Sequence, residues 1–553
     1  MGIMEGLAIS RGIAMGPVCR LQSESGPPPM QTVADMAAER ARADAAIETA
    51  KRQVMALYHS ALRSAGAQMA AIFEIHKMML EDQHFLDNIH GIIETESLNA
   101  EYAVYLTGQQ FANVFAVIGD AYMRERAADI IDLSRRVVDI LMGRKPVVMQ
   151  GRQPAVVVAE ELFPSQTVQL DKSRVLAFVS QKGSGMGHAA ILARGLKIPA
   201  VSGLGTGFAK LKDGAFVIVD GEEGTVILDP GEDTIAQYRM KQAALEDAHR
   251  LLKALHGLPA QTLDGATIAL HANISDAGEV HSALEHDAEG IGLFRSEYLY
   301  LAGSEAPGED EQYEAYKMAL SAMAPHPVVV RTLDVGADKQ ADYLKLPEED
   351  NPALGFRAIR ICLAQPQLFA AQLRALLRAS VHGKLCILFP MVSHVHQLKA
   401  ALKAVAEAKA ALLQEGQAVA EGIRLGVMVE TPAAAVMVDQ LAPLVDFISI
   451  GTNDLTQYTY AVDRTNALVR PLFTPGGTAI LRMVQHVVHT THRHGIPVGI
   501  CGESAADPQL LPHYIAMGVD ELSMAPHSIL HTKQAVRALK KADCIAALET
   551  ALG

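Results

Sequence analysis

The feature that most restricts the possible folds is a regular alternation in the C-terminal half of the chain. Short β-rich apolar segments recur there, and each is followed by a longer segment able to hold a helix. Eight such units predict a (β/α)₈ barrel over residues 261–553. The predicted strands are 267–273, 291–295, 328–333, 385–391, 424–430, 447–451, 498–502 and 520–524.

Polar side chains fall where several of these predicted strands end. Barrel enzymes carry their chemistry on the loops that follow the strands, so we expect these side chains to meet at one mouth. Alone, an arginine there can merely form an ion pair, and a cysteine is more often a small buried hydrophobe. The strand-end residues are Arg295, Arg331, Glu430, Asn453, Asp454 and Cys501.

The residue types at this mouth indicate a small, multiply charged anion and a divalent cation. Arginine forks bind phosphate and carboxylate groups through paired hydrogen bonds. Glu430 and Asp454 offer hard oxygen ligands that suit Mg²⁺, which completes its shell with water and substrate oxygens. The sequence therefore predicts a site for Mg²⁺ and an anionic substrate.

The N-terminal half has a different organisation. Residues 34–141 are rich in Ala, Glu, Arg, Met and Leu at helical spacing, which predicts a bundle over 31–143. Short β-rich runs lie on both sides of it, so the bundle is predicted to be inserted into an α/β domain made of 1–30 and 144–230. A charged amphipathic helix within 231–260 is predicted to link this half to the barrel.

Size and composition agree with a multidomain cytoplasmic protein. A chain of 553 residues is too long for one hydrophobic core. No apolar run reaches the roughly 20 residues of a membrane span, so no membrane insertion is expected. The formal net charge of −14 argues against a general attraction to nucleic acid. The start of the chain has no signal-peptide pattern, and five scattered cysteines favour a reducing compartment.

One histidine of the N-terminal half follows a glycine-rich loop. In KGSGMGHAAILAR, His188 stands at the predicted start of a helix, whose dipole and free N–H groups favour negative charge nearby. A phosphoryl group on His188 would be stabilised there. Among 21 histidines, however, one at a helix start is weak evidence, since most are surface or core residues.

Longer motifs bring in a family resemblance over essentially the whole chain. The segments AEELFPSQTVQL, HAAILARGLKIPAV, GLFRSEYLY, RTLDVGADK, NPALGFRAIR, GVMVETPAAA, FISIGTNDLTQYTYAVDR and GICGES resemble enzyme I of the bacterial phosphoenolpyruvate-dependent sugar phosphotransferase system. Several of these motifs also occur in pyruvate phosphate dikinase and phosphoenolpyruvate synthase. The helical segments IFEIHKMMLEDQHF and DAYMRERAADIIDLSRRV, which resemble the carrier-docking part of enzyme I, favour that family.

The resemblance implies a fold, a reaction and roles for individual residues. The fold is a multidomain α/β one, in which a phosphohistidine domain with an inserted carrier-binding bundle precedes the barrel. Phosphoenolpyruvate would phosphorylate the protein and leave as pyruvate, and a histidine-containing phosphocarrier protein would accept the phosphoryl group. A homodimer through the barrel is also expected. The implied roles are His188 as the phosphorylated residue, Cys501 as the proton donor, Glu430 and Asp454 as Mg²⁺ ligands, and Arg295, Arg331, Asn453, Asp454 and Arg464 as substrate ligands, with Lys339 and Arg357 as weaker additions.

The loop before the histidine departs from the family pattern. The family carries hydroxyl side chains where this chain has Met186 and Gly187, and Gly185 precedes them. Such hydroxyls can orient the imidazole and bind its phosphate. A degenerate or regulatory paralogue that binds phosphoenolpyruvate with weak transfer is therefore a second interpretation. A nucleotide-dependent dikinase is a third, but the sequence contains no P-loop.

Overall fold

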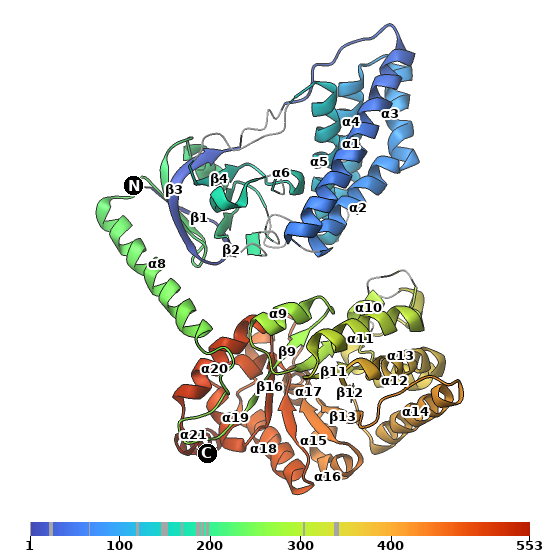
Figure 1. The fold of residues 1–553 in the computed structure, drawn as a ribbon, viewed down its shortest axis with the longest axis vertical. Coiled ribbons are helices and arrows are strands. Elements are labelled where there is room, and N and C mark those ends of the chain that lie inside the picture. Colours follow the sequence, from blue (N-terminus) through green and yellow to red (C-terminus); the bar gives the residue numbers. More distant parts are fainter. Residues whose placement is uncertain are drawn as a thin grey trace. The chain divides into compact units, whose positions relative to one another are not determined.

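The described part of the chain forms two compact units, Met1–Ala248 and His249–Gly553. Figure 1 shows both units, with many of their helices and strands labelled. The computed structural model describes residues 2–21, 26–65, 67–117, 121–144, 153–167, 170–183, 190, 193–194, 198–301, 303, 305–336 and 342–553.

The first unit contains a mixed sheet of eight strands. Their order across the sheet is β1-β8-β7-β3-β4-β5-β6-β2. Strands β3, β4, β5 and β6 pair in parallel, and all other neighbouring pairs are antiparallel. The central run AVVVA is buried along its whole length, as expected for a strand covered on both faces. The strands are β1 Gly2–Glu5, β2 Leu7–Ser10, β3 Ile13–Arg20, β4 Ala155–Ala159, β5 Val175–Ser180, β6 Ala200–Ser202, β7 Phe216–Asp220 and β8 Thr225–Leu228.

A helical bundle lies between β3 and β4 in the sequence. Alanines along its helices let them pack closely, and buried larger side chains such as Phe73, Ile89 and Leu133 fill the core. Asp82 caps one helix by accepting a hydrogen bond from the backbone N–H of Phe85. The bundle helices in the described chain are α1 Met36–Ala65, α2 Ala67–Glu81, α3 Gln83–Glu96, α4 Ala100–Val117 and α5 Ala121–Leu141, and a short α6 Pro164–Thr167 follows β4.

A long charged helix follows the sheet. Helix α8, Glu232–Lys253, has acidic residues in its first turn and basic residues in its last, which suits the helix dipole. In sequence it runs across the division between the two units. The finer division of the chain into domains stays a prediction.

The second unit is a closed barrel of eight parallel strands, which confirms the predicted (β/α)₈ fold. Each predicted strand overlaps one observed strand. Inside the barrel, Leu293, Val329, Leu388, Met428 and Cys501 belong to one buried cluster. The strands are β9 Ala269–Ile274, β10 Ile291–Arg295, β11 Pro327–Arg331, β12 Lys384–Phe389, β13 Arg424–Val429, β14 Phe447–Ile450, β15 Val498–Ile500 and β16 Glu521–Met524.

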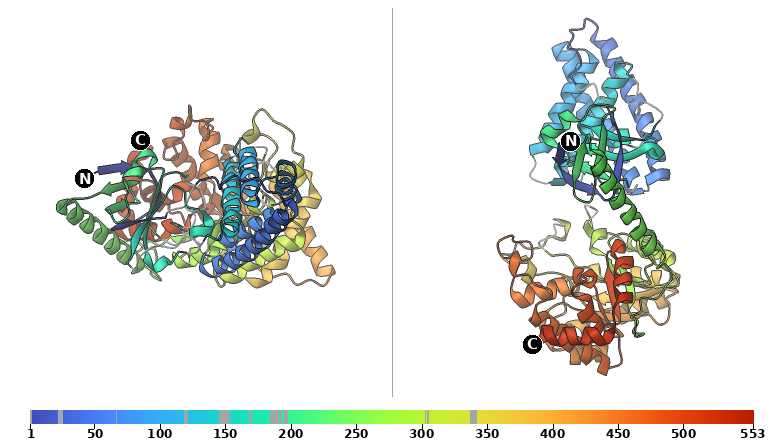
Figure 2. Two further views of the ribbon diagram at one scale, coloured as in Figure 1. Left: turned by 90° about the horizontal axis from the view of Figure 1, so that it is seen from above. Right: turned by 90° about the vertical axis from the view of Figure 1, so that its left-hand side faces the viewer.

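Helices surround this barrel, as the views in Figures 1 and 2 show. Helix α18 places Ile480, Val484, Val487 and Val488 on its buried face, at the spacing of a surface helix. The helices are α9 Glu279–Glu285, α10 Glu297–Leu301, α11 Glu309–Met323, α12 Ile359–Ala364, α13 Pro366–Ala379, α14 Val395–Gln414, α15 Pro432–Val436, α16 Val438–Leu441, α17 Thr452–Tyr460, α18 Thr478–Arg493, α19 Leu511–Met517, α20 Ile529–Ala538 and α21 Lys541–Leu552.

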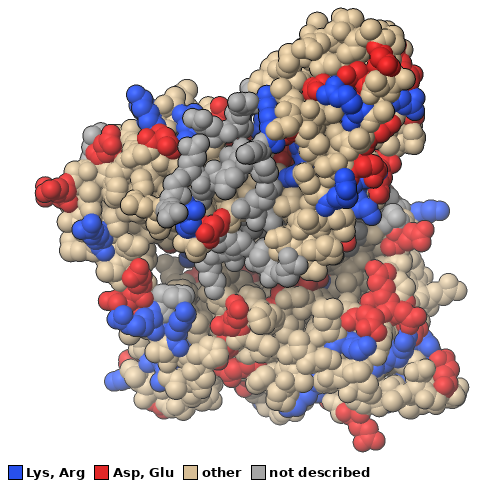
Figure 3. All heavy atoms as spheres, turned by 45° about the horizontal axis from the view of Figure 1, so that its top comes forward, with Lys and Arg blue, Asp and Glu red and all other residues tan. Residues whose placement is uncertain are grey.

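Short 3₁₀ helices complete the described elements, among them η4 Pro352–Leu354 and η8 Glu503–Ala506 at the barrel mouth. Within the described residues, no helix combines the length and the apolar character that crossing a membrane requires. On the face drawn in Figure 3, basic and acidic side chains are interspersed rather than segregated.

Candidate functional site

The seven residues with principal roles in the predicted barrel site line one cavity, and so does Arg357, which was predicted as a weaker addition. The cavity has a volume of about 700 Å³ and opens at the ends of strands β10, β11, β13, β14 and β15. The ends of these five strands thus supply the polar groups, which is where barrel enzymes place their chemistry. The predicted residues in its lining are Arg295, Arg331, Arg357, Glu430, Asn453, Asp454, Arg464 and Cys501.

Two buried arginines share one carboxylate in this cavity. Asp334 contacts Arg331 at 2.8 Å and Arg357 at 2.9 Å, and Glu297 contacts Arg331 at 2.5 Å. Burial alone would lower the pKa of both guanidinium groups, but the neighbouring carboxylates, Asp334 above all, raise it above the ordinary value. Both arginines therefore stay charged inside the protein.

Asp334 and Glu297 were not predicted as site residues. Each carries a signal in the sequence, since Asp334 stands three residues after Arg331 and Glu297 two residues after Arg295. Both acids lie in the segments that immediately follow the strands, where barrel chemistry is placed. Pairing each strand-end arginine with the nearest following acid would have identified them.

The side chains of the other two arginines of the site are more exposed to solvent. Arg295 ends β10, is partly exposed, and makes no ion pair with the residues that the structure describes. Arg464 is exposed on the loop after α17, where its backbone N–H donates to the Gln457 side chain at 3.3 Å. Neither guanidinium group forms an ion pair with a described carboxylate, although Glu279 interacts electrostatically with Arg295 and Asp463 with Arg464. Both cations therefore remain accessible to an anion.

Two further carboxylates, those of Glu430 and Asp454, lie in the same cavity. Glu430 is 1% exposed, and one of its oxygens accepts a hydrogen bond from the Met391 backbone N–H at 2.5 Å. Burial raises the pKa of Glu430 well above its usual range, and the nearby charges of Asp454 and Asp334 raise it further. Asp454 lies 3.6 Å from Arg357.

Glu430 and Asp454 suit a hard divalent cation, but they would supply only part of its ligand shell. A bound cation would relieve the repulsion between Glu430 and Asp454, and oxygen ligands suit Mg²⁺. Among the described residues, no group of three or more histidine, cysteine, aspartate or glutamate side chains is arranged around a metal position. The remaining ligands would have to be water or substrate oxygens.

The thiol of Cys501 is buried at the same mouth. Cys501 is 5% exposed, and its backbone N–H donates to the Ile450 carbonyl oxygen at 3.1 Å. Burial raises the pKa of the thiol to about 11, so the sulfur keeps its proton at neutral pH. Cys501 can therefore donate a proton, but it is a poor nucleophile.

Two predicted residues cannot be placed in this geometry. His188, with the preceding loop Gly185 to Gly187, lies outside the described residues, and so does Lys339. Strand β5 ends at Ser180, shortly before that loop. Gly183, the last described residue before it, has a φ of 133°, a conformation that favours glycine.

Three family descriptions match consecutive parts of the chain. Residues 5–126 match "PEP-utilising enzyme, N-terminal", residues 151–224 match "PEP-utilising enzyme, mobile domain", and residues 249–541 match "PEP-utilising enzyme, PEP-binding domain". The last match covers all eight barrel strands and every residue that lines the cavity. Fold, site and matches together define the class of PEP-utilising enzymes.

Curated relatives narrow this class. A protein of Geobacillus stearothermophilus named phosphoenolpyruvate-protein phosphotransferase is 46% identical over 99% of this chain and 95% of its own length. The protein of that name from Bacillus subtilis is 41% identical over 98% of this chain and 95% of its own length. The chain belongs to the phosphoenolpyruvate-protein phosphotransferase family, which confirms the resemblance to enzyme I.

A solved structure is similar in part. The solution structure of an enzyme I protein, nEIt, is 34% identical to this chain, with a TM-score of 0.38. The match covers 44% of this chain and 99% of the other.

Proposed function

We propose that this chain takes the phosphoryl group of phosphoenolpyruvate onto His188, releases pyruvate, and passes the phosphoryl group to a histidine-containing phosphocarrier protein. The observation that carries the proposal is the barrel cavity, which gathers arginines, the carboxylates of Glu430 and Asp454, and a protonated thiol at one mouth. The names of the curated relatives support this transferase over the degenerate paralogue.

The paired and the unpaired arginines would play different parts in binding the substrate. Arg331 and Arg357 are already paired with Asp334, so their guanidinium groups are held in fixed positions from which they can donate to the substrate. Arg295 and Arg464 would bind the carboxylate and phosphate groups of phosphoenolpyruvate through paired hydrogen bonds. Asn453, at the start of α17, would add an amide donor.

Glu430 and Asp454 would hold Mg²⁺, which when bound neutralises charge on the phosphoryl oxygens. Their contribution as protein groups is to fix two oxygens at the strand ends. Substrate oxygens are needed to complete the shell, so metal and substrate are expected to bind together.

The transfer itself needs an acceptor from elsewhere in the chain. The cavity lining contains no histidine among the described residues. A ring nitrogen of His188 would attack phosphorus, forming the N–P bond while the bond from phosphorus to the enol oxygen breaks. The products of this step are phosphohistidine and the enolate of pyruvate.

Cys501 would complete the conversion to pyruvate. Its S–H bond breaks as a C–H bond forms at the methylene carbon of the enolate, and the thiolate later regains a proton from water. The raised pKa of the buried thiol keeps this proton in place until the enolate appears. A protonated thiol thus serves better here than a carboxylate that has already ionised.

The partner and the assembly belong to the same proposal. The carrier would dock on the α1 to α5 bundle, and the barrel would form a homodimer, both on the strength of the family. A cytoplasmic location is supported by the five cysteines, which are all buried and are not joined in disulfides.

The direct test incubates the full chain with ³²P-labelled phosphoenolpyruvate, Mg²⁺ and a phosphocarrier. Acid-labile label should appear on both proteins, and none should reach the carrier with His188→Ala. Substrate binding without any labelled protein would favour the degenerate paralogue instead.

A further inference from the structure

Asn273 is linked through its side-chain amide to the residue that carries the proposed proton donor. Asn273 is the penultimate residue of β9, and its Nδ2 donates to the carbonyl oxygen of Cys501 at 3.1 Å and to that of Ser523 at 3.2 Å. Its Oδ1 accepts a hydrogen bond from the Ser523 hydroxyl at 2.5 Å. Both amide hydrogens and the amide oxygen are therefore engaged.

The Cys501 carbonyl needs such a partner because the strand before it is short. Strand β15 has three residues and ends at Ile500, where its pairing with β16 also ends. Asn273 reaches this carbonyl from β9, on the far side of β16. It thus supplies the donor that a backbone ladder would otherwise provide.

The opposite side of Cys501 is fixed as well. Its backbone N–H and its sulfur both lie within hydrogen-bonding distance of the Ile450 carbonyl oxygen, at 3.1 Å and 3.6 Å. The next residue, Gly502, leaves no room for a side chain, since a Cβ there would lie 1.9 Å from the Thr452 hydroxyl. The two bonds on either side of Cys501 set the direction of its side chain.

We propose that Asn273 is a positioning residue for proton transfer, holding Cys501 so that its thiol is aimed at the methylene carbon of the enolate. This inference rests on the proposed role of Cys501. Proton transfer requires the donor within hydrogen-bonding reach of its acceptor, and a displacement of about 1 Å can cost roughly a hundredfold in rate. Asn273 itself touches neither the substrate nor the transferred proton.

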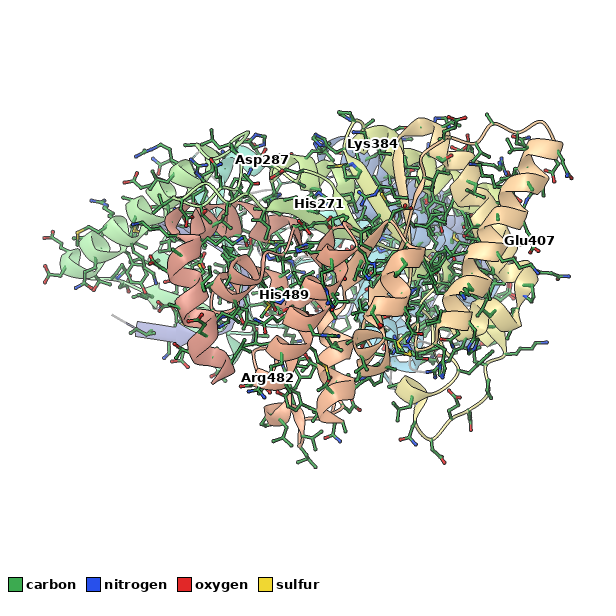
Figure 4. All side chains as sticks on the ribbon, turned by 90° about the horizontal axis from the view of Figure 1, so that it is seen from below. His271, Asp287, Lys384, Glu407, Arg482 and His489 are labelled. Atoms are coloured by element: carbon green, nitrogen blue, oxygen red, sulfur yellow. The ribbon has the colours of Figure 1, made fainter. Side chains whose placement is uncertain are left out.

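A purely structural role is the competing explanation, and the neighbouring contacts separate the two. Strands β9 and β16 are paired at four positions, and His271 of β9 contacts Glu521 of β16 at 3.0 Å. His271 is labelled on this strand in Figure 4. Because these contacts remain when Asn273 is replaced, the barrel should stay closed.

The first experiment separates the two half-reactions in the full chain with Mg²⁺. Phosphoprotein is measured after an alkaline quench, and keto-pyruvate is measured with lactate dehydrogenase. For Asn273→Ala, we expect phosphorylation within about twofold of the parent and pyruvate formation slower by roughly ten- to a hundredfold. Asn273→Asp, of the same shape, should behave alike because its ionised carboxylate cannot donate to the two carbonyl groups.

The matched control is Ser523→Ala, which removes the hydroxyl bound to Asn273 but leaves both amide donors in place. Its pyruvate formation should stay within about threefold of the parent, since the Cys501 carbonyl keeps its partner. Equal slowing of phosphorylation and pyruvate formation in both Asn273 variants would overturn the proposal.

A double variant supplies the readout that a structural role would not give. If Asn273 acts through Cys501, Asn273→Ala should have no further effect on pyruvate formation in a Cys501→Ala background. A full additional loss in that background would reject the proposal. Unimpaired pyruvate formation in Cys501→Ala alone would instead refute the donor role itself, whereas impaired Cys501→Ala with normal Asn273→Ala would refute only the positioning role.

Discussion

Replacing Asp334 by asparagine tests how the arginine pair is held. Asp334 is 2% exposed and contacts Arg331 and Arg357 at 2.8 Å and 2.9 Å. Asparagine keeps the shape but removes the charge, which leaves two buried guanidinium groups less compensated. Breaking a buried pair in this way typically costs about 3 to 5 kcal/mol, and Glu297 still partners Arg331. We expect Asp334→Asn to lower the free energy of unfolding of the barrel by about 3 kcal/mol.

The chain offers a closely matched control. Glu309 also bridges two arginines, with contacts of 2.6 Å to Arg374 and 2.7 Å to Arg378, but its side chain is 24% exposed. Water screens such a pair, so Glu309→Gln should cost less than about 1 kcal/mol. The two substitutions differ chiefly in burial, which is the quantity under test.

The measurement is hydrogen exchange at increasing urea concentration, followed on peptides from β11 and β14, because it reports on the barrel alone. Phosphoenolpyruvate should protect Asp334→Asn more than the parent, since an anion replaces the missing charge. Equal urea sensitivity of Asp334→Asn and Glu309→Gln would refute the argument from burial.

Three further predictions follow from the site, the histidine loop and the barrel interior. Mg²⁺ and phosphoenolpyruvate should bind cooperatively, and calorimetry of Glu430→Ala should show that cooperativity lost. Met186→Thr combined with Gly187→Ser should raise the rate of phosphorylation about tenfold in rapid-quench measurements without changing substrate affinity, since one added hydrogen bond to a charged group is worth about 1.5 kcal/mol or more. Burial lowers the pKa of His271, but Glu521 raises it above 6.5 overall, so its contribution to stability should be complete below pH 6.5 and lost as pH rises through the raised pKa. His271→Gln should therefore flatten this part of the stability profile in urea titrations.

The eight barrel strands could be predicted because each combines a short apolar run with a following helical segment. The residues at which the strands end were harder to predict. The predicted strand 328–333 runs two residues too far, because the observed strand ends at Arg331, where its pairing with β12 also ends. The local sequence pattern thus predicts the position of the strand, but pairing with the neighbouring strand determines its length.

The charged residues of the site could be predicted from the sequence, but the hydrogen bonds that hold the site residues in place could not. Strand-end arginines, carboxylates and the thiol follow from topology, and they do line one cavity. Asn273 could not be identified, because its partners are 228 and 250 residues away in the sequence. Such contacts depend on barrel closure, which places β9 beside β16.

The most direct test of the central claim is to locate the phosphoryl group after incubation with phosphoenolpyruvate and Mg²⁺. Mass spectrometry under alkaline conditions should find one phosphate per chain, on His188, and none on His188→Ala. Phosphate that persists in His188→Ala, or that maps to another residue in the parent, would contradict the proposed function.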